Sequence, residues 1–459
     1  MEISDKLKKQ IDEKCSEYYN DMENFLGELV RIPSVMGKAE GNMPYGKNSA
    51  EVLRVFLNKA ESLGFSVRNI DNHVGVIETG TGEPELGILC HLDVVDAGEG
   101  WNYPPFELTR SNGLLYGRGA TDDKGPAVSV LYGLKTASEL CRLNKNIRFI
   151  VGCNEENGSD DLGYYQTKEK LPEKLYTPDG QYPVINIEKG MIRGNFTKKV
   201  RSRCIRKIHG GDTVNAVPSK SVAVISGTGI QADSDENFSF SIRDDETTII
   251  SNGVSAHAST PEGGKNALTS LISLLGTIEN DDCADALKKL SQLFPSGETD
   301  GTHMAVKYSD EKSGALTLVL SIMEYDGETL EGMFDIRFPV SFSAADINKK
   351  VEKILAENGF TYECAMASEP HYVDEKSEFV QSLLRVYENV TGLKGRCIAI
   401  GGGTYVHNTS GGVAFGAELP GKEYNIHCKD EFTVPEEMIL NARMTASAAI
   451  VYVVDGKKT

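Results

Sequence analysis

The run Leu86-Gly87-Ile88-Leu89-Cys90-His91-Leu92-Asp93-Val94-Val95 is an apolar, strand-like segment that ends in a histidine and an aspartate two residues apart. Residues i and i+2 of a strand point to the same face of a sheet, so the side chains of His91 and Asp93 can reach one metal ion. The pair alone is a weak signal, because a strand end with an exposed polar pair has the same pattern. The interpretation as a metal site therefore depends on the motifs that follow.

Further polar motifs follow this run, each just after a short apolar segment or a turn. They are Gly117-Arg118-Gly119-Ala120-Thr121-Asp122-Asp123-Lys124-Gly125, Asn154-Glu155-Glu156-Asn157-Gly158, Pro178-Asp179 and Asn425-Ile426-His427. In open α/β sheets, ligands bind at the carboxyl ends of the strands, which is where His91 and the Glu155-Glu156 pair are expected.

Two histidines and several carboxylates are the ligand types of a hydrolytic zinc, cobalt or manganese site. Two divalent ions about 3.5–4 Å apart require a carboxylate that bridges them, further ligands for each ion, and room for a shared water. The groups that fit are an imidazole each from His91 and His427, Asp122 as the bridge, and Glu156 and Asp179 to complete the two shells. A further carboxylate must stay off the metals to take the proton of the bridging water, and Glu155 suits this role.

At these residues the chain resembles the co-catalytic di-metal peptidase family that includes aminoacylase, carnosinase, succinyl-diaminopimelate desuccinylase and glutamate carboxypeptidase. Within that family it is most similar to the bacterial dipeptidase V branch, also called Xaa-His dipeptidases. The branch-like motifs are Gly98-Glu99-Gly100-Trp101, Asp122-Asp123-Lys124-Gly125-Pro126, Pro178-Asp179 and Gly401-Gly402-Gly403-Thr404-Tyr405. The resemblance covers nearly the whole chain.

The resemblance implies a ligand set for two divalent ions, with zinc as the first expectation and manganese or cobalt as alternatives. The implied ligands are His91, Asp122, Glu156, Asp179 and His427, with Asp122 bridging. It also implies that Asp93 hydrogen-bonds the second ring nitrogen of His91, which would fix the tautomer of the ring. Glu155 would be the general base, and the Asp122-Asp123 peptide would be cis.

Composition is that of a soluble enzyme and excludes some partners. The 459 residues suffice for about two to four domains, and 40% hydrophobic with 25% charged residues is ordinary for a globular protein. A net charge of −19 argues against binding to nucleic acid or to an anionic membrane surface. Nine cysteines without a CxxC pair predict reduced thiols. The lack of a signal pattern or a membrane-length apolar run predicts a cytoplasmic protein.

Residues 1–189 and 373–459 are predicted to form an α/β, zinc-peptidase-like catalytic domain with a mainly parallel central sheet. Helical periodicity predicts helices over 5–31, 49–63, 126–143 and 378–391. Strands are predicted over 66–69, 74–78, 86–90, 147–153 and 396–399.

Residues 190–372 are predicted to form an inserted α+β lid domain made of two ferredoxin-like halves. The expected strands are 191–199, 221–225, 237–242, 247–251, 316–325, 331–339 and 361–366, and the expected helices are 266–277 and 344–358. A long insertion of this kind resembles the monomeric dipeptidases, in which the second half of the lid replaces a partner subunit. The resemblance therefore implies a monomer.

Specificity is expected to come from this insertion, because a two-metal centre alone can hydrolyse many acyl compounds. The resemblance implies that Asn215 contacts the substrate and that His257 donates a hydrogen bond to the tetrahedral oxyanion. Arg337 is a candidate to bind a substrate carboxylate in bidentate fashion, although a solvated arginine on a strand has the same pattern. Backbone N–H groups suited to the same carboxylate are offered by Gly401, Gly402, Gly403 and Thr404.

The sequence therefore predicts a metal-dependent dipeptidase that hydrolyses unblocked dipeptides through a metal-bridging water activated by Glu155. Its expected partner is a small peptide substrate. One alternative is an N-acyl amino acid deacylase with the same two metals. Another is a catalytically inactive, metal-dependent binding protein, although such a protein gains nothing from an unligated base beside a ligand.

Overall fold

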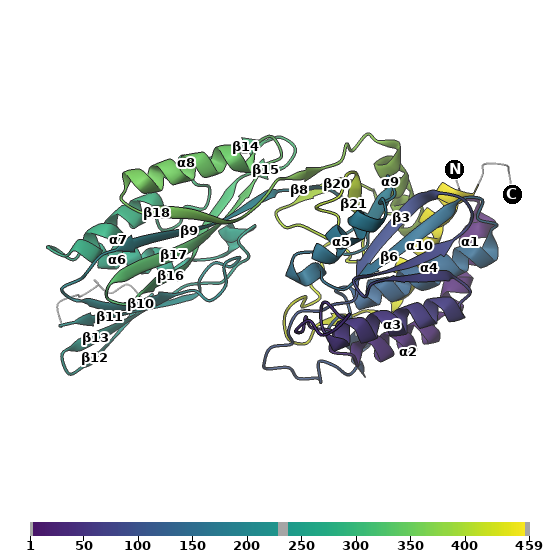
Figure 1. Ribbon diagram of the computed structural model, residues 1–459, viewed down its shortest axis with the longest axis horizontal. Helices are drawn as coiled ribbons and strands as arrows, with labels where there is room; N and C mark the ends of the chain where they lie inside the picture. Colours follow the sequence, from purple (N-terminus) through teal and green to yellow (C-terminus); the bar gives the residue numbers. More distant parts are fainter. Residues whose placement is uncertain (1–2, 228–236, 455–459) are drawn as a thin grey trace. The chain divides into compact units, whose positions relative to one another are not determined.

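The computed structural model describes residues 3–227 and 237–454, which form two compact units (Figure 1). Unit 1 comprises Met1–Asn186, Val373–Ile398 and Thr404–Thr459, and unit 2 comprises Ile187–Tyr372 and Ala399–Gly403. Unit 2 is thus an insertion in unit 1. It also includes a short glycine-containing segment from the later part of the chain.

The sheet of unit 1 has a parallel centre and antiparallel flanks, in the order β1-β2-β6-β3-β7-β21-β8-β19, with β20 paired to β8. Its strands are β1 (Ser66–Ile70), β2 (Val74–Thr79), β3 (Pro84–His91), β6 (Asn146–Gly152), β7 (Leu175–Thr177), β8 (Val184–Glu188), β19 (His371–Tyr372), β20 (Cys397–Ile400) and β21 (Gly412–Ala414).

The expected parallel arrangement holds for β6, β3, β7 and β21. The pairs β1–β2, β2–β6, β21–β8 and β8–β19 are antiparallel. Parallel neighbours need a long crossover, whereas β1 and β2 are separated by only a short turn and can pair only in the antiparallel sense. The prediction of a mainly parallel sheet was therefore right for the centre and wrong for the edges.

Strand β3, which carries the first motif, is buried on both faces. Ile88 belongs to the larger hydrophobic cluster of unit 1, whereas Leu89 packs on the opposite face with Leu162. A central parallel strand covered on both sides has to be apolar along its length, which explains the continuous apolar run that precedes His91.

Helices cover both faces of this sheet (Figure 1). They are α1 (Asp5–Glu17), α2 (Tyr19–Val30), α3 (Lys47–Ser62), α4 (Lys124–Leu140), α5 (Asp160–Lys168), α9 (Glu378–Thr391) and α10 (Pro435–Val453). Helices α4 and α10 pack against each other and against β3, while α5 contacts β2 from the other side. The helix α10 was not predicted from the sequence.

The single helix expected over residues 5–31 is divided at Tyr18, between α1 and α2. The ring of Tyr18 lies 5.3 Å from that of Tyr132 in α4, and its hydroxyl donates to Glu139 at 2.9 Å. Both α1 and α2 pack on α4. The division lets the two segments follow the surface of α4, a tertiary effect that helical periodicity does not reveal.

Small elements of unit 1 lie between the larger ones. A three-stranded sheet has the order β22-β5-β4, with β4 (Thr109–Ser111), β5 (Leu114–Tyr116) and β22 (Phe432–Thr433). In it Phe432 pairs with Tyr116, which joins segments more than three hundred residues apart in sequence. A single 3-10 turn, η1, covers Glu155–Asn157.

Unit 2 is built on an eight-stranded antiparallel sheet in the order β12-β13-β11-β10-β16-β17-β9-β18. Its strands are β9 (Gly190–Lys199), β10 (Ile205–Gly210), β11 (Lys220–Ser226), β12 (Phe238–Arg243), β13 (Glu246–Asn252), β16 (Thr317–Tyr325), β17 (Thr329–Phe338) and β18 (Thr361–Ser368). Two four-stranded halves join through the β10–β16 pair. A separate two-stranded ladder consists of β14 (Ser309–Asp310) and β15 (Gly314–Ala315).

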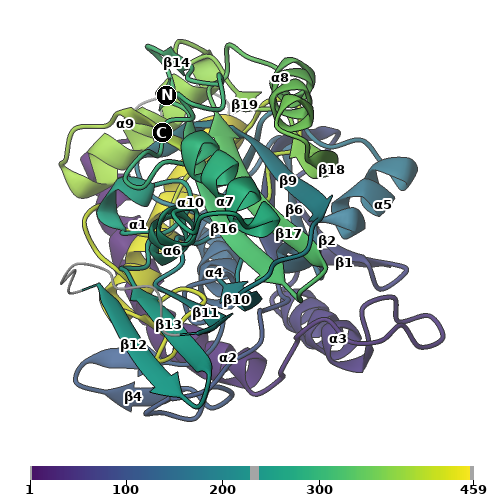
Figure 2. The same cartoon turned by 90° about the vertical axis from the view of Figure 1, so that its left-hand side faces the viewer.

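Helices α6 (Ala267–Leu275), α7 (Asp282–Leu293) and α8 (Ala344–Glu357) accompany this sheet, together with the 3-10 turn η2 (Pro261–Gly263). Helix α8 packs on β18 and β9. Helix α6 packs beside α7 and contacts β11 and β13 of the other half, and also β16 at the junction of the two halves (Figure 2). The expected α+β insertion with two halves is therefore present. The sequence interpretation missed β10 and α7, although Asp281 caps α7 by accepting from the N–H of Ala284.

None of the helices in residues 3–227 and 237–454 combines the length and the apolar character needed to cross a lipid bilayer.

The last residue of β6 supplies a test of this packing. A Cβ on Gly152 would lie 1.7 Å from the Tyr405 hydroxyl oxygen and 2.4 Å from the Asp161 carboxylate. We expect Gly152→Ala to lower the free energy of unfolding by about 1–3 kcal/mol through overpacking. Chemical denaturation would measure the change.

Gly163→Ala is the matched control, because a Cβ at this position of α5 meets nothing within 4 Å. This substitution should stabilise the helix by about 0.5–1 kcal/mol. Equal stability of the two variants would contradict the packing described at Gly152.

Candidate metal centre

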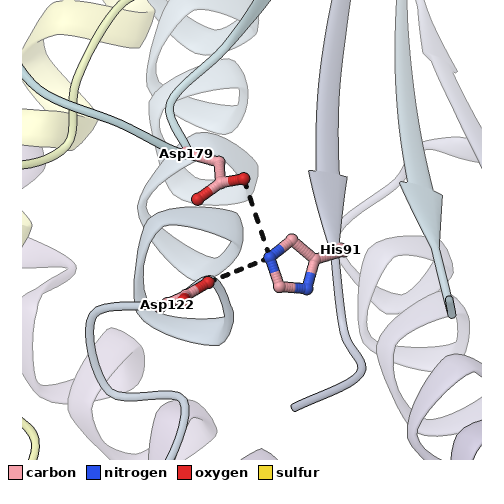
Figure 3. Close-up of side chains that lie close together, drawn as sticks. All are labelled: His91, Asp122 and Asp179. Atoms are coloured by element: carbon pink, nitrogen blue, oxygen red, sulfur yellow. Dashed lines mark hydrogen bonds and ion pairs between the residues drawn. The ribbon is translucent and has the colours of Figure 1, made fainter. Parts of the chain in front are cut away.

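The first group of candidate ligands lies at the carboxyl end of β3 (Figure 3). His91 Nε2 is 3.0 Å from Asp122 Oδ1 and 3.8 Å from Asp179 Oδ2. Asp122 comes from the loop before α4, and Asp179 from the loop after β7. The imidazole of His91 has no solvent exposure.

A second group shares Asp122 with the first. His427 Nε2 lies 2.9 Å from Asp122 Oδ2 and 3.0 Å from Glu156 Oε1. The two oxygens of Asp122 therefore face different histidines, which is the arrangement that a bridging ligand requires. His427 has a φ of 59°, in the left-handed region that is uncommon for residues other than glycine.

The donor geometry of both groups fits divalent ions. Ligand atoms about 2.1 Å from a tetrahedral ion lie about 3.4 Å from one another. The distances of 2.9–3.8 Å between the imidazole nitrogens and carboxylate oxygens lie on both sides of that value. Each group offers one nitrogen and two carboxylates, a donor set suited to zinc, manganese or cobalt. The residues present therefore fit a two-metal centre.

Asp93 prepares His91 for such a role. The Nδ1 atom of His91 lies 3.1 Å from the Asp93 carbonyl oxygen and 3.4 Å from its carboxylate. Both neighbours are acceptors, so Nδ1 carries a proton, and the ring presents Nε2 to the two aspartates, where it would bind a metal ion as a neutral imidazole.

Asp93 also fixes the turn that carries the Glu155-Glu156 pair. Its two carboxylate oxygens accept the backbone N–H groups of Glu155 at 3.2 Å and Glu156 at 3.1 Å. Glu156 reaches His427, whereas Glu155 belongs to neither group of candidate ligands in the described residues. One buried aspartate thus orients both a ligand histidine and the turn of the expected base.

Asp122 and Asp123 have different roles although they are adjacent. Asp122 faces the two histidines, whereas Asp123 Oδ2 accepts the backbone N–H of His91 at 3.0 Å. The peptide between them is cis, as the family resemblance predicted.

The carboxyl groups of the centre lie close together, and their burial and mutual repulsion shift their pKa values. Burial and the charge of Asp122 raise the pKa of Asp179 to about 7. Burial raises the pKa of Glu155 well above its usual range. Burial also opposes ionisation of Asp122, but hydrogen bonds from the two histidines outweigh it and lower its pKa. The hydrogen bonds that His427 makes with Asp122 and Glu156 raise its pKa to about 11. Bound cations would neutralise this excess of carboxylates.

Asp161 is a supporting residue that the sequence interpretation missed. Asp161 is fully buried and accepts the backbone N–H groups of Cys153 and Asn154 and the hydroxyl of Tyr405. It thereby holds the chain just before Glu155. Its place shortly after the Glu155-Glu156 motif is the only sequence signal for it, and an acidic residue early in a helix is normally a solvated one.

Unit 2 brings Asn215 and the segment of His257 together. The N–H of Ala258 donates to the Asn215 carbonyl at 2.8 Å, beside a β-bridge between Ala216 and His257. His257 Nδ1 accepts from the backbone N–H of Ser259 at 3.2 Å and lies 2.7 Å from its hydroxyl. A neutral imidazole that accepts at Nδ1 carries its proton on Nε2.

Arg337 is engaged within the protein. Its guanidinium donates to both carboxylate oxygens of Asp335, at 2.6 and 3.0 Å, and to the Gly401 carbonyl at 2.9 Å. Only 5% of the residue is exposed. Arg337 therefore holds the Gly401 segment in place, and these three bonds leave further N–H groups of the guanidinium available.

The glycine-rich segment follows β20 and is divided between the units. Gly401, Gly402 and Gly403 belong to unit 2, whereas Thr404 begins the last part of unit 1. A Cβ on Gly401 would lie 2.4 Å from that of Ser259, so only glycine allows this approach to the segment that bears His257.

Known proteins share the sequence pattern and the fold. The sequence model of peptidase family M20/M25/M40 matches residues 87–450. Beta-Ala-Xaa dipeptidase of Lactobacillus delbrueckii subsp. lactis is 33% identical over 456 residues, which cover 92% of this chain and 94% of that protein.

Solved structures agree in fold. Human carnosine dipeptidase 1 matches with a TM-score of 0.63 at 14% identity, over 97% of this chain and 99% of that chain. Aminoacylhistidine dipeptidase from Vibrio alginolyticus matches with a TM-score of 0.59 at 15% identity, over 95% and 96% of the two chains. At these identities the likeness concerns the fold alone.

The crowded carboxylates predict how stability depends on pH and on metal. Burial raises the pKa of Asp179 from 3.8 to about 7 and that of Glu418 from 4.5 to about 7. A carboxyl group whose pKa is higher in the folded state stabilises the fold fully below its unfolded pKa, and this contribution is lost as the pH rises through the folded value.

We therefore expect the metal-free protein to unfold at a lower temperature at pH 8 than at pH 5, by about 2 °C or more. Added zinc or manganese should raise the unfolding temperature more at pH 8 than at pH 5, because bound cations offset the repulsion between the ionised carboxylates. Calorimetry of metal-free and metal-loaded protein at both pH values would measure this. A metal-free protein that is equally stable at both values would contradict the electrostatics described.

Proposed function

The chain belongs to peptidase family M20/M25/M40, and on that premise we propose that it is a two-metal dipeptidase that hydrolyses unblocked dipeptides. It is a metallopeptidase, and the resemblance first seen in its motifs is confirmed. The observation that carries the proposal is the pair of ligand groups joined by Asp122, with the unligated carboxylate of Glu155 on the adjoining turn. A 33% identical dipeptidase aligned over most of both chains supports the substrate class.

The metals would be held by residues of unit 1. His91, Asp122 and Asp179 would bind one ion, and Asp122, Glu156 and His427 the other. When bound, the two ions would polarise the scissile carbonyl and make a water acidic enough to attack near neutral pH. Zinc is our first choice, with manganese and cobalt as alternatives for the same donors.

Glu155 would take the proton of the attacking water and return it to the leaving amine. Two features support this assignment. Its backbone is fixed by Asp93, and burial raises the pKa of its carboxyl group well above the usual range, which makes the carboxylate a stronger base than an exposed one. A carboxylate that bound a metal would be a weaker base, which is why the assignment requires Glu155 and not Glu156.

Residues of unit 2 would bind the substrate and the developing charge. The hydrogen bond from the Ser259 N–H to Nδ1 requires that a neutral His257 carries its proton on Nε2, and this N–H would donate to a tetrahedral oxyanion. Asn215 shares a backbone hydrogen bond with the segment of His257. Arg337, through Gly401, would shape the segment Gly401–Thr404 that receives the substrate carboxylate.

We further propose that one chain is sufficient for activity. The support for this proposal is that unit 2 contains two four-stranded halves in one continuous sheet, so that its second half would replace a partner subunit.

A substrate panel tests the proposed reaction. Metal-stripped protein would be incubated with unblocked dipeptides, tripeptides and N-acetyl amino acids, with zinc, manganese or cobalt restored in turn, and amine release would be measured. We expect cleavage of the unblocked dipeptides, because a free ammonium group is attracted by the carboxylates around Asp179. Preference for N-acetyl amino acids would identify a deacylase, and inactivity with every metal would favour a binding protein.

Adjacent variants separate the base from the ligand. Glu155→Gln keeps the size of the side chain and should retain both ions while kcat falls about 10²- to 10⁴-fold, the usual contribution of a general base. Metal content by atomic emission and kcat by amine release would be measured together.

Glu156→Gln is the matched comparison and should lose metal as well as activity, because Glu156 Oε1 contacts His427. If the Glu155 variant loses metal and the Glu156 variant keeps it, the two roles are reversed.

A further inference from the structure

Glu431 is a buried carboxylate that the reaction outlined above does not use. It lies four residues after His427, immediately before β22, and is fully buried. Within the described residues, Glu431 belongs to neither group of candidate metal ligands. Its hydrogen bonds lead instead to the loop that carries Asp122.

The carboxylate of Glu431 accepts four hydrogen bonds from that loop. Oε1 accepts the backbone N–H groups of Thr121 at 2.9 Å and Asp122 at 3.2 Å. Oε2 accepts the backbone N–H of Gly119 at 3.1 Å and Nη1 of Arg118 at 2.7 Å. Hydrogen bonds to an ionised acceptor are stronger than neutral ones, so this one side chain fixes the backbone of the bridging ligand.

Backbone contacts attach the same residue to the same loop. The Glu431 carbonyl accepts the N–H of Gly117 at 2.9 Å, and the Phe432 carbonyl accepts the Thr121 hydroxyl at 2.6 Å. The pairing of β22 with β5 continues this contact at Tyr116. The chain just after His427 is thus attached along its length to the chain just before Asp122.

The segment from His427 to Glu431 is itself well fixed. The Asn425 amide donates to the Asp430 carbonyl at 3.1 Å, and the N–H of Cys428 donates to the Asn425 carbonyl at 2.9 Å. The Asp430 carboxylate accepts both the backbone and the side-chain N–H of Asn102. A displacement of Glu431 is therefore transmitted to His427 through a short, hydrogen-bonded turn.

Arg118 supplies the charge that allows Glu431 to be buried as a carboxylate. It is 1% exposed, and its Nη2 atom lies 3.3 Å from the Asp96 carbonyl oxygen. Its guanidinium also lies over the ring of Trp101, 5.1 Å from the centroid. A buried ion pair with further hydrogen bonds on both partners is rigid, and removal of one partner leaves the other uncompensated.

We propose that Glu431 is a positioning residue that sets the separation of Asp122 and His427 and thereby the affinity of the centre for its metal ions. The inference rests on the proposed metal centre. Asp122 is common to both ligand groups, so a shift of its loop would affect the binding of both ions. Glu431 follows His427 closely in the chain, so a displacement of Glu431 would also move His427.

Glu431→Gln tests this with little change in shape. The amide oxygen can still accept from Thr121 and Asp122, but the amide nitrogen then faces two donors, from Gly119 and Arg118. We expect the affinity for Zn²⁺ and for Mn²⁺, each measured alone by calorimetric titration, to fall about 10- to 100-fold, the usual effect of losing a residue that orients metal ligands.

Hydrogen exchange supplies a second measurement that does not depend on metal or activity. In the metal-free protein, exchange in peptides covering 117–123 and 425–431 should increase together in Glu431→Gln. A residue that only supports the fold would lower the unfolding temperature without this joint effect. If Glu431→Gln does not fold, Glu431→Asp keeps the charge opposite Arg118 while shortening the reach, and the same two measurements apply.

Asp281→Asn is the matched control in unit 2. Asp281 is also buried and accepts the backbone N–H groups of Arg203, Cys204 and Ala284. This variant should lose stability but bind metal with the parent affinity and leave exchange in the two loops unchanged.

Parent-like metal affinity together with unchanged loop exchange in Glu431→Gln would overturn the inference, even if dipeptide hydrolysis by the parent is observed. Weaker metal binding with faster exchange in both loops would support it, even if the parent hydrolyses no dipeptide. A parent that hydrolyses no dipeptide, together with these changes in Glu431→Gln, would refute the proposed function and leave the role of Glu431 intact.

Discussion

The structure of unit 1 depends on one electrostatic constraint, which is that several carboxylates must lie within a few ångströms of one another in a partly buried place. Asp122 is shared between His91 and His427, and Asp179 and Glu156 approach the same histidines. Without cations such an arrangement is opposed by repulsion and by the loss of hydration. The fold has to hold it in place from outside.

Buried carboxylates that bind backbone N–H groups provide this support. Asp93 holds the Glu155-Glu156 turn, Asp161 holds the residues before it, Asp123 holds His91, and Glu431 holds the Asp122 loop. Each of these carboxylates fixes main chain, so the ligand side chains extend from a rigid backbone. The negative charge near the metals is thus larger than the ligands alone require, and part of it is used to organise loops.

Ligands and substrate residues are divided between the two units. All five candidate metal ligands and Glu155 belong to unit 1, whereas Asn215, His257, Arg337 and Gly401 belong to unit 2. Within unit 2, hydrogen bonds join His257 to Ser259 and Arg337 to Asp335 and Gly401, and the two groups meet where Gly401 approaches Ser259 closely. The candidate metal ligands and the predicted substrate residues are therefore built on different sheets.

The sequence alone determined the family, the candidate metal ligands, the insertion of a second unit and most central strands, because these follow from local motifs and from short-range periodicity. Helix α9 was predicted with its observed bounds, and β3 nearly so. The tertiary structure decided the break at Tyr18, the antiparallel edges of the sheet and the positions of β10, α7 and α10. It also assigned different contacts to the two members of each acidic pair and revealed Asp161 and Glu431. These features depend on hydrogen bonds and packing between segments far apart in the chain, as between Glu431 and Thr121. A local pattern of residues does not identify such distant partners.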